Sequence, residues 1–350
     1  MSISISFLGD IVLNGAYPEY REKGLNPFES LRSELADQDY VIGNLECIAK
    51  GDHGENEQKK PRLTTTVKTL EYLKDINLNV ACLAQNHIYD HLLDGFNKTV
   101  NFLQKSGIQY IGAGLTSHEA QKYIILKKKS LAIGLLNYVT NDTNPNLPED
   151  ARVFLNVFDL DQCIKDISEL KKHVRHVVVL LHWGGRVEGG LFPDWNQPTI
   201  ARQLIESGAD LIVGHHSHTY QSFQVYKGRH IFYSLGNFCF SDYTFDGEFI
   251  PLIKRRRLTP ILKVNFNDNF YQLEIKFFRN HGAFFTPLSG IIFGINSKLL
   301  KALLRVKLLW LIYFESQKHL LPFTEFMRRK DISFGLKLYR IISSIKRRFL

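Results

Sequence analysis

Cysteine is scarce in this sequence. The 350 residues contain four cysteines, and no two of them form a Cys-x-x-Cys pair of the kind that holds a structural zinc ion or acts in redox chemistry. Cys82 and Cys239 lie inside apolar runs, so we expect reduced thiols in the protein core. Reduced thiols are typical of a cytosolic protein.

Long hydrophobic runs are also missing. No eighteen consecutive apolar residues occur without a charge, so no transmembrane helix is expected. The first ten residues, MSISISFLGD, lack a basic segment and a long apolar segment, so no secretory signal peptide is expected. Internal repeats and low-complexity segments are absent, and the content of 44% apolar and 12% aromatic residues is that of a globular protein. We therefore expect a cytoplasmic protein.

Acidic residues are few in the C-terminal part of the chain. From residue 296 onward there are thirteen Lys and Arg against three acids, which gives a net charge of +10. Because the whole chain carries +9, residues 1–295 carry −1, and the basicity says nothing about them. We therefore divide the chain into a main domain, residues 1–295, and a basic amphipathic helical tail, residues 296–350.

Two stretches of this tail, Leu299 to Phe314 and Leu336 to Leu350, interleave apolar residues with Lys and Arg. A helix of this kind can lie on an anionic surface, here as a peripheral contact with the inner face of the membrane. It can equally pack on the main domain with its cationic face in water, and the sequence leaves both alternatives open. No nucleic-acid-binding motif accompanies the charge, so no nucleic-acid partner is expected.

The main domain alternates strand-like and helix-like segments, which predicts an α/β fold with helices on the faces of a sheet. We expect strands at 2–8, 40–44, 80–84, 109–111, 131–136, 176–181, 210–214 and 230–233, helices at 27–37, 67–75, 92–105, 161–172 and 199–207, and a final antiparallel pair at 261–266 and 270–278. The polar segment 50–60 is expected to be an exposed, mobile loop.

Six of the apolar strands stop at a residue that can bind a metal ion or form hydrogen bonds. These residues are Asp10, Glu46, Asn86 with His87, His182, His216 with His218, and Asn237. In α/β sheets, ligands bind beyond the carboxyl ends of the strands. The sequence therefore predicts one shared site.

The segment Asp210 to His218, DLIVGHHSH, is the clearest of these strand ends. If the segment is extended, His216 and His218 point to the same side and can share one ion, while His215 points to the other side. The alternative is that one histidine caps a turn and the others face water. The spacing after a glycine favours the metal.

A set of Asp, Glu, Asn and His ligands without thiolates suits one or two ions of Mn, Fe or Zn. Such a site is typical of a hydrolase in which two metal ions generate hydroxide and neutralise charge on the attacked group. His87 follows Asn86 directly and is a candidate general acid for the leaving group. Asp90 either orients His87 or caps the following helix, and the sequence leaves both open.

The combined motifs resemble the CapA family, the poly-gamma-glutamate synthesis and capsule proteins related to calcineurin-like metallophosphoesterases. The matching segments, in order, are FLGD ending at Asp10, NLE ending at Glu46, LAQNH ending at His87, HWG starting at His182, GADLIVGHHSH ending at His218, and YSLGNF ending at Phe238. The resemblance implies a four-layer α/β/β/α sandwich for residues 3–285. It also implies that Asp10, Glu46, Asn86, His182, His216 and His218 are metal ligands, with His87 the catalytic or phosphate-binding histidine.

The sequence departs from the wider family at two positions. Val12 stands where metallophosphoesterases have the histidine of Asp-x-His, a loss that CapA-like sequences share, which weakens one metal site. Arg186 stands where CapA-like proteins have a glutamate, with Glu188 close but out of register. We expect Arg186 at the mouth of the site as a contact for an anionic substrate group. Trp183 is expected as a pocket wall or a packing residue. Asn237 is expected as a further substrate contact that holds a loop against the metals, with an ordinary strand-ending turn as the alternative.

The function implied by this resemblance is metal-dependent hydrolysis in capsule, poly-gamma-glutamate or cell-surface polymer biosynthesis. The substrate would be an anionic polymer or a phosphoester. The alternative is a non-catalytic assembly subunit of a membrane-associated polymer synthase, with a vestigial metal site. Val12 and Arg186 both favour that alternative.

Overall fold

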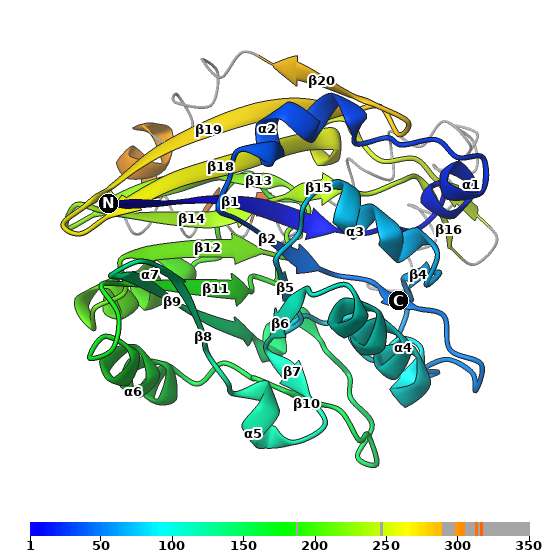
Figure 1. The fold of residues 1–350 in the computed structure, drawn as a ribbon, viewed down its shortest axis with the longest axis horizontal. Coiled ribbons are helices and arrows are strands. Elements are labelled where there is room, and N and C mark those ends of the chain that lie inside the picture. Colours follow the sequence, from blue (N-terminus) through cyan, green and yellow to red (C-terminus); the bar gives the residue numbers. More distant parts are fainter. Residues whose placement is uncertain (187, 246–247, 289–297, 305–311, 314–315, 318–350) are drawn as a thin grey trace, which may run out of the picture.

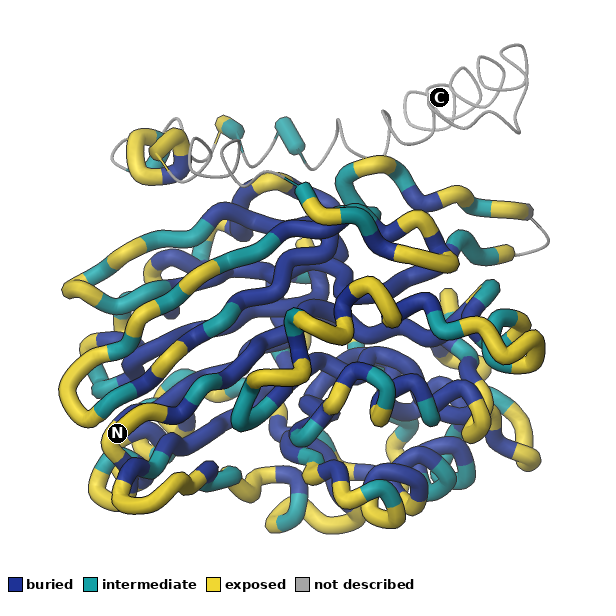
Figure 2. Tube along the Cα trace, turned by 45° about the horizontal axis from the view of Figure 1, so that its top comes forward, coloured by how far each residue is buried: buried dark blue, intermediate teal, exposed yellow. Residues whose placement is uncertain are grey.

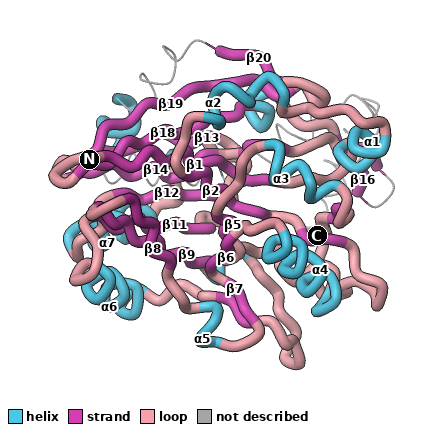
Figure 3. The backbone as a smooth tube through the Cα atoms, viewed as in Figure 1, coloured by secondary structure: helices cyan, strands magenta, loops and turns pink. Residues whose placement is uncertain are grey.

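The computed structural model describes residues 1–350 except 187, 246–247, 289–297, 305–311, 314–315 and 318–350. Two large β-sheets dominate the fold, and strands occupy the middle of the molecule with the helices outside them (Figures 1 and 3). The bounds of the helices are α1 (Tyr17–Glu22), α2 (Arg32–Ala36), α3 (Tyr72–Asp75), α4 (Leu92–Lys105), α5 (Ser117–Ala120), α6 (Leu160–Leu170) and α7 (Gln197–Glu206), with 3₁₀ turns η1 (Glu29–Leu31), η2 (Thr69–Glu71), η3 (Asn141–Thr143) and η4 (Lys254–Arg257).

The first sheet has eight strands. In spatial order they are β20 (Phe285–Leu288), β19 (Tyr271–Asn280), β18 (Leu258–Asn267), β1 (Ser2–Ile11), β2 (Tyr40–Leu45), β5 (Val80–Cys82) and β6 (Gln109–Ile111), with β15 (Asn237–Cys239) pairing alongside β1. Strands β1, β2, β5 and β6 run parallel, so their carboxyl ends lie at one edge. The predicted antiparallel pair near the C-terminal end of the main domain is confirmed as β18 and β19.

The second sheet has six strands. In spatial order they are β13 (Tyr220–Tyr226), β14 (Arg229–Leu235), β12 (Leu211–His215), β11 (His176–His182), β9 (Leu131–Val139) and β8 (Ile124–Lys128). The four inner strands are parallel. Three short two-stranded pairs complete the strands: β3 (Ile48–Ala49) with β4 (Thr64–Thr65), β7 (Ala113–Gly114) with β10 (Phe154–Leu155), and β16 (Tyr243–Phe245) with β17 (Glu248–Ile250).

Three apolar clusters separate the layers. One lies between the two sheets, where Phe7 and Ile42 of the first sheet meet Val178 and Phe232 of the second. A second cluster covers the outer face of the first sheet with residues of α1 to α4, and the third covers the outer face of the second sheet with residues of α6 and α7. Buried residues follow the strands while exposed ones gather in the connections (Figure 2). The predicted four-layer α/β/β/α sandwich is therefore confirmed.

The prediction of reduced thiols in the protein core is confirmed, because all four cysteines are free and buried. Burial raises the pKa of Cys47 to about 12, so this thiol stays protonated and unreactive at neutral pH. Among the residues that the structure describes, no helix combines the length and the apolar character needed to cross a membrane.

Most of the expected tail, and its boundary at residues 295 and 296, lie outside the described residues. The parts that are described contact the domain: Leu300 is buried in the cluster on the outer face of the second sheet. The ring of Tyr313 packs edge-on against Phe192, with 5.1 Å between ring centroids. For these residues the contacts match the alternative in which the tail packs on the domain.

Candidate metal centre

The candidate site lies where parallel strands of both sheets end. Asp10 is on β1, Glu46 follows β2 and Asn86 follows β5, while His182 ends β11. Two close backbone approaches lie near these strand ends. A Cβ atom at Gly9 would lie 2.0 Å from the carbonyl oxygen of Gly236, and one at Gly214 would lie 1.9 Å from that of Tyr233, so only glycine fits at either position.

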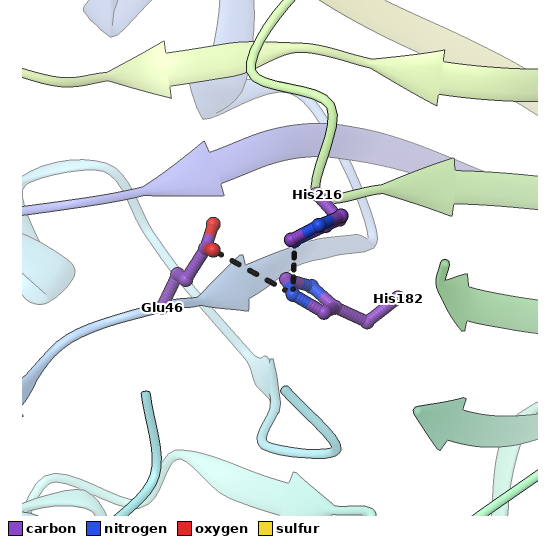
Figure 4. A group of neighbouring side chains, drawn as sticks. All are labelled: Glu46, His182 and His216. Atoms are coloured by element: carbon purple, nitrogen blue, oxygen red, sulfur yellow. Dashed lines mark hydrogen bonds and ion pairs between the residues drawn. The ribbon is translucent and has the colours of Figure 1, made fainter. Parts of the chain in front are cut away.

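The first ligand group joins Glu46, His182 and His216 (Figure 4). Their side chains point toward one another from three different strand ends. His182 Nε2 lies 3.1 Å from His216 Nδ1 and 3.6 Å from Glu46 Oε1. The amide oxygen of Asn86 completes the group at 3.0 Å from the same Nε2 atom.

The second ligand group joins Asp10, Glu46 and His218. His218 Nδ1 lies 3.4 Å from Asp10 Oδ2, and His218 Nε2 lies 3.6 Å from Glu46 Oε1. The ligand atoms within each group lie within 4.8 Å of one another. The structure thus brings all six predicted ligands together, and Glu46 belongs to both groups.

The prediction that the segment through His216 and His218 is extended is wrong. Strand β12 ends at His215, and His216 and His218 adopt left-handed backbone conformations with φ of 89° and 54°. The two rings therefore enter different ligand groups. His215 points elsewhere, as expected, and its Nε2 lies 3.2 Å from the carbonyl oxygen of Leu8.

Two asparagines hold the ligands in place. Asn44, which precedes Glu46 by two residues, donates from Nδ2 to Asp10 Oδ1 at 2.9 Å and lies 3.2 Å from His182 Nδ1. Sequence reasoning did not assign it a role, although it lies near the end of the strand that Glu46 follows. Asn237 Oδ1 lies 2.9 Å from His218 Nδ1, and this buried contact orients a ligand rather than a substrate.

The charges in the centre influence one another strongly. Burial raises the pKa of Glu46 well above its ordinary value, and the nearby carboxylate of Asp10 adds to this effect. Burial lowers the pKa of His216 to about 4, which keeps its ring neutral, the form that binds metal ions. Burial would also lower the pKa of His218, but the charges of Glu46 and Asp10 outweigh it and raise that pKa to about 9.

Glu46 provides the test of whether these residues fit a metal ion. It is fully buried, and neither carboxylate oxygen has a hydrogen-bond donor among the described residues; His182 and His218 face its Oε1 from 3.6 Å, beyond hydrogen-bonding distance. Buried carboxylates in proteins are normally hydrogen-bonded, paired or bound to a metal ion. Two clusters of oxygen and imidazole ligands around such a carboxylate fit divalent cations.

His87 and Asp90 form a hydrogen-bonded pair beside the ligands. His87 Nδ1 lies 2.6 Å from Asp90 Oδ2, so Nδ1–H donates to the carboxylate and Nε2 is left to hold or release a proton. Asp90 also accepts from the backbone N–H of Leu63 at 2.6 Å. Helix α4 has His91 at its N-cap and no side-chain cap, so the helix-cap alternative for Asp90 is wrong.

The expectation of an exposed loop at 50–60 is wrong for Lys59, although most of the segment is exposed. Lys59 is 4% exposed, and its ammonium group donates to the backbone carbonyl of Asn86. Burial lowers the pKa of Lys59 to about 8, although the carboxylates of Asp90 and Glu46 act in the opposite direction. A buried lysine beside His87 is a further candidate functional residue that sequence reasoning missed, because a polar loop carries no periodicity.

Two predicted substrate contacts lie elsewhere. Trp183 is buried in the cluster outside the second sheet, and its Nε1–H donates to the carbonyl oxygen of Tyr233 at 2.9 Å. Arg186 is exposed, and its guanidinium lies 5.9 Å from the ring centroid of Trp195. These placements argue for a packing role for Trp183 and against either residue as a direct contact in the metal centre.

A family model described as bacterial capsule synthesis protein PGA_cap matches residues 4–242, which include every predicted ligand. The chain belongs to this family. The resemblance expected from the motifs is thereby confirmed. This PGA_cap chain is 33% identical over 252 residues to the PGA biosynthesis protein CapA of Bacillus subtilis (strain 168), covering 68% of this chain and 63% of that protein.

The capsule biosynthesis protein CapA of Bacillus anthracis is 28% identical over 247 residues, which cover 68% of this chain and 60% of that protein. The PGA_cap chain therefore spans about three fifths of the length of these curated relatives. Among solved structures, it is similar to a 5'-nucleotidase precursor from Thermus thermophilus, with 14% identity, a TM-score of 0.42, and coverage of 79% of this chain and 54% of that one. The NAD nucleotidase NadN of Haemophilus influenzae gives 14% identity, a TM-score of 0.43, and coverage of 91% and 60%.

Proposed function

We propose that this PGA_cap chain is a metal-dependent hydrolase of the metallophosphoesterase type that acts in capsule, poly-gamma-glutamate or cell-surface polymer biosynthesis. The observation that carries the proposal is the buried carboxylate of Glu46, which has no hydrogen-bond donor within the described part of the chain and belongs to two ligand groups at once. One or two divalent ions, of Mn, Fe or Zn, would be held by Asp10, Glu46 and His218 and by the group around His182.

The bound ions would supply Lewis-acid activation and neutralise negative charge on the attacked group. The protein itself provides the proton chemistry. Asp90 fixes His87 through Nδ1, so that Nε2 can release a proton to the leaving group. Burial lowers the pKa of His87, and the charge of Asp90 acts in the opposite direction, so Asp90 favours the protonated ring that a general acid needs.

The test is hydrolysis of a chromogenic phosphodiester by the full chain loaded with Mn(II), beside elemental analysis of the same protein. We expect turnover that falls by roughly 10²- to 10⁴-fold in His87→Ala, with the metal content unchanged. Turnover that is equal in the variant and the wild type would contradict the role of His87.

One observation favours the second candidate, a non-catalytic assembly subunit. Val12 is fully buried in the apolar cluster beside the centre, so the Asp10 group has no ligand from that position. A protein that binds metal but turns over no phosphoester, polyglutamate amide or glycopolymer substrate would support this candidate.

The partners belong to the same proposal. An anionic polymer or phosphoester would be the substrate, and the basic tail would contact the inner face of the membrane peripherally. Sedimentation with anionic liposomes tests the second point. Replacing Lys346, Arg347 and Arg348 with glutamine should lower the pelleted fraction, and equal recovery would remove the membrane contact.

A further inference from the structure

Two charged side chains outside the predicted site form a salt bridge at the metal centre. Glu188 lies in the loop after β11, and Arg256 lies in the 3₁₀ turn η4. Arg256 Nη2 lies 2.8 Å from Glu188 Oε1. Neither residue belongs to the ligand groups or to the His87–Asp90 pair.

The backbone on either side of this salt bridge is fixed to the loop that carries the histidine ligands. Gly189 N–H donates to the carbonyl oxygen of Ser217, the residue before His218, at 2.9 Å. Asn237 joins Arg256 to His218, because its Nδ2 donates to the carbonyl oxygen of Arg256 at 2.9 Å while its Oδ1 lies 2.9 Å from His218 Nδ1. The salt bridge is therefore held beside the second ligand group from both ends.

The two partners differ in their access to solvent. The Arg256 side chain is 13% exposed, whereas that of Glu188 is 42% exposed. A guanidinium that is fixed and mostly buried, with its carboxylate partner accessible, is suited to exchange one anion for another. Arginine suits this task because its planar fork matches both carboxylate and phosphate oxygens.

The surrounding charge favours anions as well. Turn η4, which carries Arg256, has four consecutive cations, Lys254 to Arg257, of which Arg257 is paired with Asp242. Such a concentration of positive charge raises the local concentration of anionic ligands. Arg186, which the sequence suggested for this task, lies against Trp195 instead.

We propose that Arg256 binds an anionic group of the substrate, a phosphate or a carboxylate, beside the metal centre, and that Glu188 occupies this position until the substrate displaces it. This inference rests on the proposed function, because it assigns the anion to the substrate of the same centre. A substrate anion must therefore bind Arg256 more strongly than the Glu188 carboxylate does in order to displace it.

The test measures binding of two probes, inorganic phosphate and a glutamate tetramer, to the full chain loaded with Mn(II), by isothermal titration calorimetry. We expect Arg256→Gln to weaken binding of the probes roughly tenfold or more, because the substitution removes a charge-assisted hydrogen bond. Glu188→Gln should tighten binding about threefold or more, because the competing charge is gone. The matched control is Arg21→Gln, which breaks the 3.1 Å salt bridge to Asp75 on the outer helices and should leave binding unchanged.

Metal content and the unfolding midpoint are measured on each variant, so that a folding defect is recognised. The proposal is overturned if Arg256→Gln binds both probes as tightly as the wild type, or if the wild type binds neither. It is also overturned if weaker binding in Arg256→Gln comes with an equal loss of metal. The probe that binds more tightly identifies the anion as phosphate or carboxylate. A chain that binds a probe through Arg256 but hydrolyses nothing would remove the hydrolase and leave the anion site.

Discussion

Replacing Glu46 with glutamine should stabilise the metal-free protein and destabilise the metal-loaded one relative to the wild type. In the absence of metal, the buried carboxylate lacks hydrogen-bond donors among the described residues, which costs about 1–3 kcal/mol of folding free energy. A neutral amide is less costly to bury. We therefore expect Glu46→Gln to raise the unfolding midpoint in EDTA by about 2–5 °C.

With metal bound, the wild type should have a higher unfolding midpoint than Glu46→Gln. An ion present at a thousand times its dissociation constant stabilises the wild type by about 4 kcal/mol, which exceeds the cost of the buried charge. Glu46→Gln loses the ligand common to both groups, so most of this gain should disappear. Scanning calorimetry of both proteins in EDTA and in Mn(II) measures the four midpoints.

Glu34→Gln is the matched control for this experiment. The Glu34 carboxylate accepts from Lys263 at 2.6 Å and from Lys276 at 2.9 Å, so its neutralisation should lower the midpoint slightly and equally in both buffers. If Glu46→Gln is less stable than the wild type in EDTA, or gains as much from Mn(II), then Glu46 is not the common ligand that the geometry indicates.

Three further changes test other parts of the structure. Asp90→Asn should lower phosphodiester hydrolysis less than His87→Ala does, because the ring survives but loses its carboxylate partner; equal losses in the two variants would contradict a positioning role. Asp210→Asn should lower the free energy of unfolding by about 2–4 kcal/mol, because the buried carboxylate accepts from Lys171 and from Arg229 at 3.0 Å. Burial would raise the pKa of Asp210, but His176, Lys171 and the backbone N–H of Val177 hold that pKa below its ordinary value. The contribution of Asp210 is therefore present above the unfolded pKa near 4 and is lost as the pH falls. Denaturant titrations of variant and wild type should converge in acid, and a constant difference would refute this. Gly214→Ala should give little folded protein on expression, because its Cβ would lie 1.9 Å from a backbone oxygen, and a normal yield with a normal unfolding midpoint would show that the neighbouring strand can move.

The sequence predicts the inner strands well because they are buried on both faces. Strand β11 is buried at all seven positions and reads as a continuous apolar run. The sequence does not predict the edge strands β8 and β13. Strand β8 has only three apolar residues before two lysines, and polar residues interrupt β13. The register of each comes from its pairing partner, β9 or β14. Strand β15 is three residues long and exists because it pairs with β1, a contact that no local pattern encodes.

In the candidate site, too, residues next to buried strands are predicted from the sequence, whereas residues in irregular segments are not. All six ligands follow or end apolar strands, so the strand pattern places them at a common edge. Lys59, Glu188 and Arg256 lie in irregular segments, where the path of the backbone depends on the packed domain. The sequence also does not predict that His216 and His218 enter different ligand groups. This placement depends on left-handed backbone conformations, which non-glycine residues adopt only when the surrounding structure imposes them.

The ligand groups take their members from both sheets: Asp10, Glu46 and Asn86 come from the first, and His182, His216 and His218 from the second. An ion bound there would cross-link the two sheets of the sandwich at the edge where they meet. Force that pulls the sheets apart would then have to break coordination bonds before it exposed the apolar layer between them. Mechanical unfolding of single molecules should show a higher rupture force with metal than with chelator.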